Sequence, residues 1–165
     1  MSTLVDSADA SHELSWLTAL RRYIVFIAVA NFVWEIAQLP LYTIWQTGTA
    51  REISLAVIHC TGGDVLIASA SLLGTLLLLS NCRWPYRRYV TIAALAVIAG
   101  LAYTIFSEWL NTAVRGSWAY SDLMPTVPVI GSGVSPLAQW LVVPLAAALW
   151  ARRRATVRPD VQLFT

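Results

Sequence analysis

Four long apolar runs constrain the fold more than any other feature of the sequence. A helix needs roughly 17 to 25 residues to cross a bilayer, at about 1.5 Å rise per residue. Only 12% of the residues are charged, against about 25% in a typical soluble domain. We therefore predict an all-α, polytopic four-helix transmembrane bundle that forms one membrane domain, residues 21–151. The predicted spans are residues 23–45, 53–80, 89–110 and 134–151.

The basic residues predict the orientation of these spans. All eleven are arginines, and nine of them lie before the first span, between the second and third, or after the fourth. Arg51 and Arg115 alone fall in the other two connections. By the positive-inside rule, we expect a multi-pass protein of the bacterial cytoplasmic (inner) membrane with both termini in the cytoplasm. We interpret the arginine clusters as topology signals, and we expect no nucleic-acid partner.

The segments outside the spans have distinct compositions. Residues 1–20 lack the basic start and apolar core of a secretory signal, so we expect a cytoplasmic tail with a short interfacial helix. Residues 152–165 are expected to form a basic cytoplasmic tail. The outer loop, residues 111–133, is rich in turn formers and aromatic residues, which favours an ordered cap. Preference of Trp and Tyr for the membrane interface is the alternative explanation of these aromatics.

Ionisable and amide side chains interrupt all four spans, although such groups are costly in a membrane. Counting from the arginine boundaries places Glu35 and Gln139 about 20 Å above the cytoplasmic side of a core roughly 30 Å thick. The same rise places Asp64 about 18 Å and His59 about 10 Å below the outer surface. Because residues three or four apart share a helix face, we predict a polar pocket that opens outward. The candidate catalytic residues are Glu35, Asp64 and Glu108, and the candidate substrate-binding residues are Gln38, His59, Trp118, Tyr120 and Gln139.

Proline and glycine residues predict local irregularities near this pocket. Pro40 lacks an N–H group and frees a carbonyl in the preceding turn. Gly62 and Gly63 separate His59 from Asp64, which an ideal helix would point apart. A bend at these glycines would turn both side chains to the cavity. Close helix packing is the alternative, and it is the interpretation we favour.

The three acids suggest acid/base chemistry. Two neighbouring carboxylates in a low-dielectric site cannot both ionise cheaply, so we expect at least one to be protonated at neutral pH. A neutral acid beside an ionised one can perform general acid/base catalysis. The alternative is that the acids only join the helices through hydrogen bonds. One histidine cannot build a multi-histidine metal site, and Cys60 and Cys82 fit no disulfide framework. We therefore expect no metal and no cofactor.

One segment carries a resemblance to a known group of proteins. Residues 107–144 contain an acid at a helix end, Glu108, then Gly116-x-Trp118-x-Tyr120, and then a helix start with Pro136 and Gln139. This pattern resembles carotenoid-biosynthesis membrane proteins, namely the heterodimer-type lycopene cyclases and the membrane carotenoid hydratases. The cyclases carry Pro-Leu-Glu-Glu where this chain has Pro-Leu-Ala-Gln. The stretches WEIAQLPLYTIW and HCTGGDVLIA resemble small bacterial four-helix membrane proteins of unassigned function.

These observations lead to three hypotheses about function. The first is an intramembrane acid/base enzyme that acts on an isoprenoid-like or other lipophilic small molecule. The second is a small transporter or proton-coupled permeation unit that assembles as a homo-oligomer. The third is a non-catalytic accessory membrane subunit. The dry inner halves of the first and last spans favour a one-sided pocket over a channel.

Overall fold

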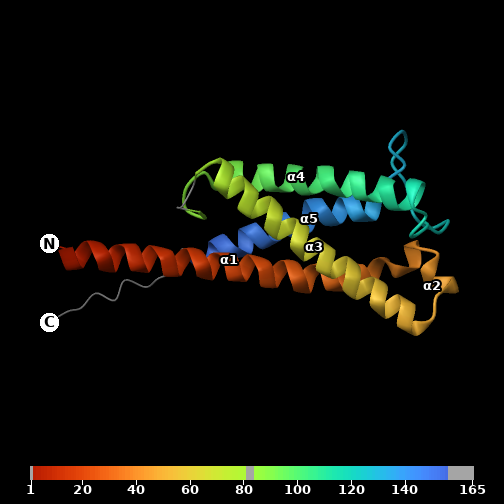
Figure 1. Ribbon diagram of the computed structural model, residues 1–165, viewed down its shortest axis with the longest axis horizontal. Helices are drawn as coiled ribbons and strands as arrows, with labels where there is room; N and C mark the ends of the chain where they lie inside the picture. Colours follow the sequence, from red (N-terminus) through yellow and green to blue (C-terminus); the bar gives the residue numbers. More distant parts are fainter. Residues whose placement is uncertain (1, 81–83, 156–165) are drawn as a thin grey trace.

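The computed structural model describes residues 2–80 and 84–155, with side chains from Trp16 to Arg152 outside the gap. Most of the expected basic tail, residues 156–165, lies outside the described residues, and so does Cys82. Four long helices form the body of the protein, and no β-strand occurs in the described ranges (Figure 1). These helices are α1 (Ser2–Gln38), α3 (Ala50–Leu78), α4 (Tyr89–Trp109) and α5 (Val134–Ala155).

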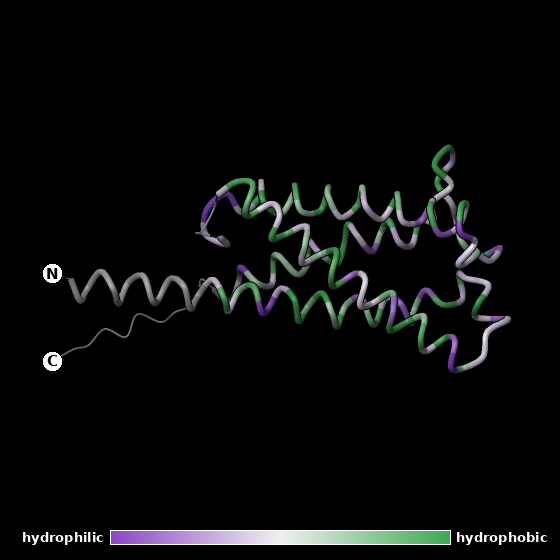
Figure 2. The backbone as a smooth tube through the Cα atoms, viewed as in Figure 1, coloured by the Kyte–Doolittle hydropathy of each residue, from purple (hydrophilic) through white to green (hydrophobic). Residues whose placement is uncertain are grey.

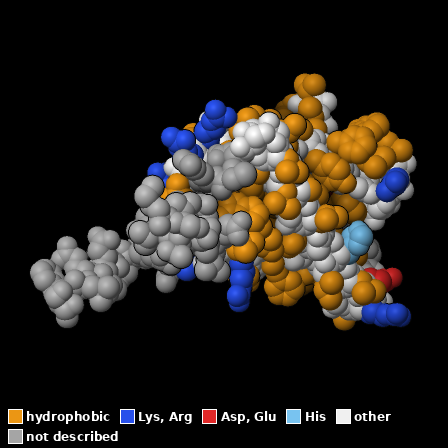
Figure 3. Space-filling model, turned by 60° about the vertical axis from the view of Figure 1, so that its left-hand side comes forward, with side chains coloured by type: hydrophobic (Ala, Val, Ile, Leu, Met, Phe, Trp, Pro, Cys, Tyr) orange, Lys and Arg blue, Asp and Glu red, His pale blue; other side chains and the backbone are white. Residues whose placement is uncertain are grey.

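Each long helix contains a segment long and apolar enough to cross a membrane. Hydrophobic residues follow all four helices (Figure 2) and gather over the middle of one face of the molecule (Figure 3). The prediction of an all-α four-helix bundle with four candidate spans is confirmed; its orientation in the membrane stays a prediction. The candidate spans are Trp16–Leu41, Ala50–Leu78, Tyr89–Val114 and Val134–Arg152.

The helices form a four-sided arrangement in which α1 and α4 each pack against α3 and α5. The beginning of α1 and the end of α5 lie at the same end of the bundle (Figure 1). A core of buried apolar side chains fills this half, and Ile27, Leu72, Ile92 and Ala147 belong to it. From this half, α3 diverges from α4 as it runs back toward Ala50 (Figure 1).

The first span differs from the expectation at both ends. In place of a tail with a short interfacial helix, α1 runs without a break from Ser2 to Gln38, a stretch that contains neither glycine nor proline. The span ends at Leu41, whereas we predicted Trp45, because Pro40 cannot donate the next helical hydrogen bond. A 3-10 turn, η1 (Leu39–Leu41), and a short helix, α2 (Ile44–Thr47), follow.

The glycines of α3 do not mediate helix packing. A Cβ atom built on Gly62 or Gly63 would meet nothing within 4 Å, so the interpretation as close-packing residues is wrong. The helix is also unbroken at these positions, and a capping box between Thr49 and Glu52 starts it. The tight contact lies elsewhere: a Cβ on Gly100 of α4 would fall 2.2 Å from the ring of Trp140 in α5.

Candidate functional site

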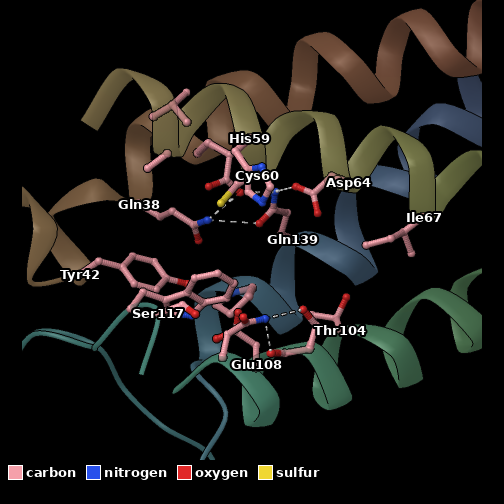
Figure 4. Close-up of a pocket in the computed structure, with 18 of the residues that line it drawn as sticks. Gln38, Tyr42, His59, Cys60, Asp64, Ile67, Thr104, Glu108, Ser117 and Gln139 are labelled. Atoms are coloured by element: carbon pink, nitrogen blue, oxygen red, sulfur yellow. Dashed lines mark hydrogen bonds between the residues drawn. The ribbon is translucent and has the colours of Figure 1, made fainter. Parts of the chain in front are cut away.

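A cavity of about 370 Å³ lies in the half of the bundle opposite the apolar core. All four long helices contribute to its wall, together with the start of the outer loop. Figure 4 shows side chains of α3, among them His59 and Asp64, facing those of α4, with Gln139 of α5 between them. The structure brings all the predicted site residues to this cavity except Tyr120. Their roles in catalysis or binding stay predictions.

Gln139 is the centre of a hydrogen-bond network that joins three helices. Its side chain is only 2% exposed. The amide nitrogen Nε2 donates to Asn31 Oδ1 (2.8 Å), Glu35 Oε1 (3.1 Å) and Asp64 Oδ2 (3.0 Å). An amide group carries two hydrogens, so the three acceptors must share them. The position of Gln139 therefore links α5 to α1 and α3 at the level of both acids.

Two anchors fix the orientation of the amide groups in this network. The indole of Trp34 can only donate, and it donates to Ser135 Oγ (3.1 Å). The Ser135 hydroxyl in turn donates to Gln38 Oε1 (2.8 Å), so Gln38 Nε2 faces Glu35 Oε1 (2.9 Å). The hydrogen bonds from Trp34 through Ser135 to Gln38 thus orient the Gln38 amide so that its N–H group donates to the Glu35 carboxyl.

The second anchor acts on Asn31. Its amide nitrogen donates to the carbonyl oxygen of Ile27 within α1 (2.9 Å), which leaves Oδ1 as an acceptor. That oxygen accepts from Gln139 Nε2 and fixes which end of the Gln139 amide faces the acids. Both acids therefore receive N–H donors, and neither meets a basic side chain in the network.

The carboxyls of Glu35 and Asp64 accept from the same atom, Gln139 Nε2 (3.1 and 3.0 Å), and interact with each other. Two carboxylates at this separation repel each other strongly in a low-dielectric site, whereas one shared proton turns the repulsion into a hydrogen bond. One proton shared between them would leave a neutral acid beside an ionised base. Both residues line the cavity, so a bound molecule can reach them.

Glu108 occupies the opposite wall of the cavity and is 6% exposed. Its carboxyl accepts a hydrogen bond from the phenol of Tyr120, whose oxygen accepts from the backbone N–H of Gly133 (3.0 Å). Burial and the bond to Glu108 raise the pKa of Tyr120 above its ordinary value, so the phenol stays a donor. Tyr120, a predicted substrate-binding residue, does not line the cavity; its ring packs against that of Tyr42 at an interplanar angle of 55°, with centroids 5.6 Å apart.

The outer loop attaches to the break that follows α1. Thr43 N donates to Ala119 O (2.9 Å), and Ser121 N donates to Leu41 O (2.9 Å). The Ser121 hydroxyl also donates to the carbonyl oxygen of Pro40 (2.9 Å). The irregular backbone near Pro40 therefore serves as the docking point that holds Trp118 at the cavity.

His59 and Cys60 lie on the cavity wall beside each other but take no part in the network. His59 is exposed and makes no hydrogen bond to any residue that the structure describes. Within the same described ranges, no group of three or more His, Cys, Asp and Glu side chains is arranged to hold a metal ion. The position of His59 suits contact with a molecule entering the pocket.

Several residues of the site were not among the predicted site residues. Asn31 and Ser135 lie one turn from Glu35 and Gln139, on the same polar helix faces, and that spacing could have indicated them. Trp34 and Trp140 carried no such signal. Tryptophan is common in membrane spans, and the sequence alone does not show whether its N–H group donates a hydrogen bond. In the comparisons with known proteins, no family model, no curated protein and no solved structure matches the chain.

Proposed function

We propose that this integral membrane protein binds a lipophilic molecule in its one-sided pocket and performs acid/base chemistry on it. The observation that carries the proposal is the Glu35–Asp64 pair, which lies on the wall of a cavity lined by apolar and aromatic side chains together with polar ones. The neutral member of the pair donates a proton to a double bond or hydroxyl group of the substrate. The ionised member accepts a proton in return, so the pair is restored.

The other candidate residues have supporting roles in this proposal. Gln38 and Gln139 hold the acids in position, and Glu108 assists from the opposite wall. Trp118 covers the substrate and stabilises positive charge that develops on it, while His59 contacts the molecule at the rim. We propose an isoprenoid-like molecule as the substrate, because residues 107–144 resemble carotenoid-biosynthesis membrane proteins.

The apolar half of the bundle favours a pocket over a transport pathway. A proton or solute path needs polar groups along the whole span. Among the described residues of that half, the buried polar groups are Thr75, the phenol of Tyr23 and the indole N–H of Trp84. The remaining buried side chains there are apolar and packed together. The transporter and accessory-subunit hypotheses receive no comparable support.

The test is mass spectrometry of molecules that co-purify with the protein, combined with thermal stability. Wild type is compared with Glu35→Gln and Asp64→Asn, and Asp122→Asn is the control because Asp122 is exposed in the outer loop. The proposal expects an apolar molecule in the wild type whose amount or chemical form changes in the two pocket variants only. If both pocket variants melt early and no small molecule is found in any sample, the acids serve only to join the helices.

A further inference from the structure

Thr104 has a buried hydroxyl group with no partner among the described residues. It lies on α4, is 6% exposed and lines the cavity. Its Oγ1 atom makes no hydrogen bond to any residue in the described part of the chain. Threonine in a helix can bond to the carbonyl four residues earlier, yet here that bond is not made. A buried polar atom without a partner is uncommon, and it calls for an explanation.

Trp118 presents a second unpartnered group to the same cavity. Its indole nitrogen Nε1 is buried and makes no hydrogen bond of ordinary geometry within the described ranges. It lies within hydrogen-bonding reach of the Glu108 carboxyl, toward which it can donate. Thr104 and Glu108 are one turn apart on α4 and therefore share a helix face. One wall of the pocket thus carries an unpartnered hydroxyl beside an indole N–H and a carboxyl.

We propose that this wall is a subsite for a neutral oxygen group, a hydroxyl or a carbonyl, on an otherwise apolar molecule. Such an oxygen can accept from both the Thr104 hydroxyl and the Trp118 indole. Three carboxyl groups, those of Glu35, Asp64 and Glu108, line the cavity with one guanidinium, that of Arg115, and this balance disfavours an anionic group. Val57, Ile67 and Pro136 line the cavity as well and suit a hydrocarbon chain. The inference rests on the proposed function and narrows its substrate class to lipophilic alcohols and carbonyl compounds.

The test compares two probes that differ in the oxygen group, farnesol and the hydrocarbon farnesene. Affinities are measured by native mass spectrometry of protein in lipid nanodiscs. Because each probe partitions equally into the nanodiscs of every variant, the ratio of variant to wild-type affinity isolates the protein contribution. The variants are Thr104→Val, which preserves shape, and Trp118→Phe, which keeps an aromatic ring.

Thr61→Val is the matched control, because Thr61 also has a buried hydroxyl without a described partner but does not line the cavity. We expect Thr104→Val and Trp118→Phe each to weaken farnesol binding by about 2- to 10-fold. Farnesene binding should stay unchanged in both, and Thr61→Val should bind both probes like the wild type. Thermal stability of Thr104→Val should also equal that of the wild type, because no protein hydrogen bond is lost.

Three results would overturn the inference, and they separate it from the proposed function. Equal losses for both probes in Thr104→Val would mean that the substitution acts on packing. If farnesene binds as tightly as farnesol in every variant, the oxygen subsite is wrong while the lipophilic pocket stands. If neither probe binds the wild type, both the subsite and the proposed function fail.

Discussion

Replacement of Gly100 by alanine should destabilise the bundle at the contact between α4 and α5. The new Cβ atom would lie 2.2 Å from Cζ3 and 2.5 Å from Cε3 of Trp140, whereas carbon atoms pack favourably at about 3.5 to 4.0 Å. Trp140 is 4% exposed and packed against the core, so its ring can yield only toward the cavity that it also lines. Overpacking of this kind costs about 1 to 3 kcal/mol.

A second glycine variant separates this clash from the general effect of alanine on a helix. Alanine in place of glycine stabilises a helix interior by roughly 0.5 to 1 kcal/mol. Gly74 of α3 has nothing within 4 Å of its built Cβ, so Gly74→Ala gains this term without a clash. Both variants gain the same helix-propensity term, so it cancels when the two are compared. Gly100→Ala should therefore be less stable than Gly74→Ala by about 1 to 3 kcal/mol, the cost of the clash with Trp140.

The assay is reversible unfolding in mixed detergent micelles, followed by far-UV circular dichroism. Because Trp140 also lines the pocket, its near-UV signal should change in Gly100→Ala and stay the same in Gly74→Ala. Equal free energies of unfolding for the two variants would refute the packing of α4 against α5 described above.

Two further residues give predictions about the site. Gln139→Leu should lower the free energy of unfolding by about 2 kcal/mol, because it removes four interhelical hydrogen bonds worth about 0.6 kcal/mol each. Gln46→Leu, at an exposed position, should leave it unchanged, and equal stability of the two variants in the same unfolding assay would contradict the network. Tyr120→Phe removes the bonds to Glu108 and from Gly133, so amide hydrogen exchange of the outer loop should accelerate while that of α1 stays unchanged. Because the pKa of Tyr120 is raised, the folded state retains this proton above about pH 10, the ordinary tyrosine pKa, where the unfolded state loses it. Stability should therefore fall as the pH rises beyond that point, and less steeply in Tyr120→Phe. Identical slopes would be inconsistent with a phenol that bonds to both Glu108 and Gly133.

Counting residues along the spans was sufficient to place the polar groups at one level. The heights of Glu35, Asp64 and Gln139 follow from the helical rise, and spacing of three or four residues gives the shared faces. Height does not give the direction in which an amide group points. The orientation of Gln38 depends on Trp34 and Ser135, which lie on two different helices, so local sequence could not supply it.

Two differences between the expected and the observed structure have a common physical origin. The adjacent glycines Gly62 and Gly63 suggested a close helix contact, but both face open space on the tilted helix α3. The close contact forms between Gly100 and Trp140. Helix tilt and rotation depend on the whole set of packing partners. Tyr120 likewise became a hydrogen-bond donor to Glu108 because the loop docks on the break near Pro40, a tertiary contact without a sequence signature.

The most direct test of the account is infrared spectroscopy of protonated carboxyl groups at neutral pH. The central claim is that Glu35 and Asp64 share one proton, while Glu108 accepts a hydrogen bond from Tyr120. The account predicts a protonated-carboxyl band in the wild type that persists in Glu108→Gln and disappears in the double variant Glu35→Gln with Asp64→Asn. Absence of the band from the wild type, or its loss in Glu108→Gln alone, would contradict the claim.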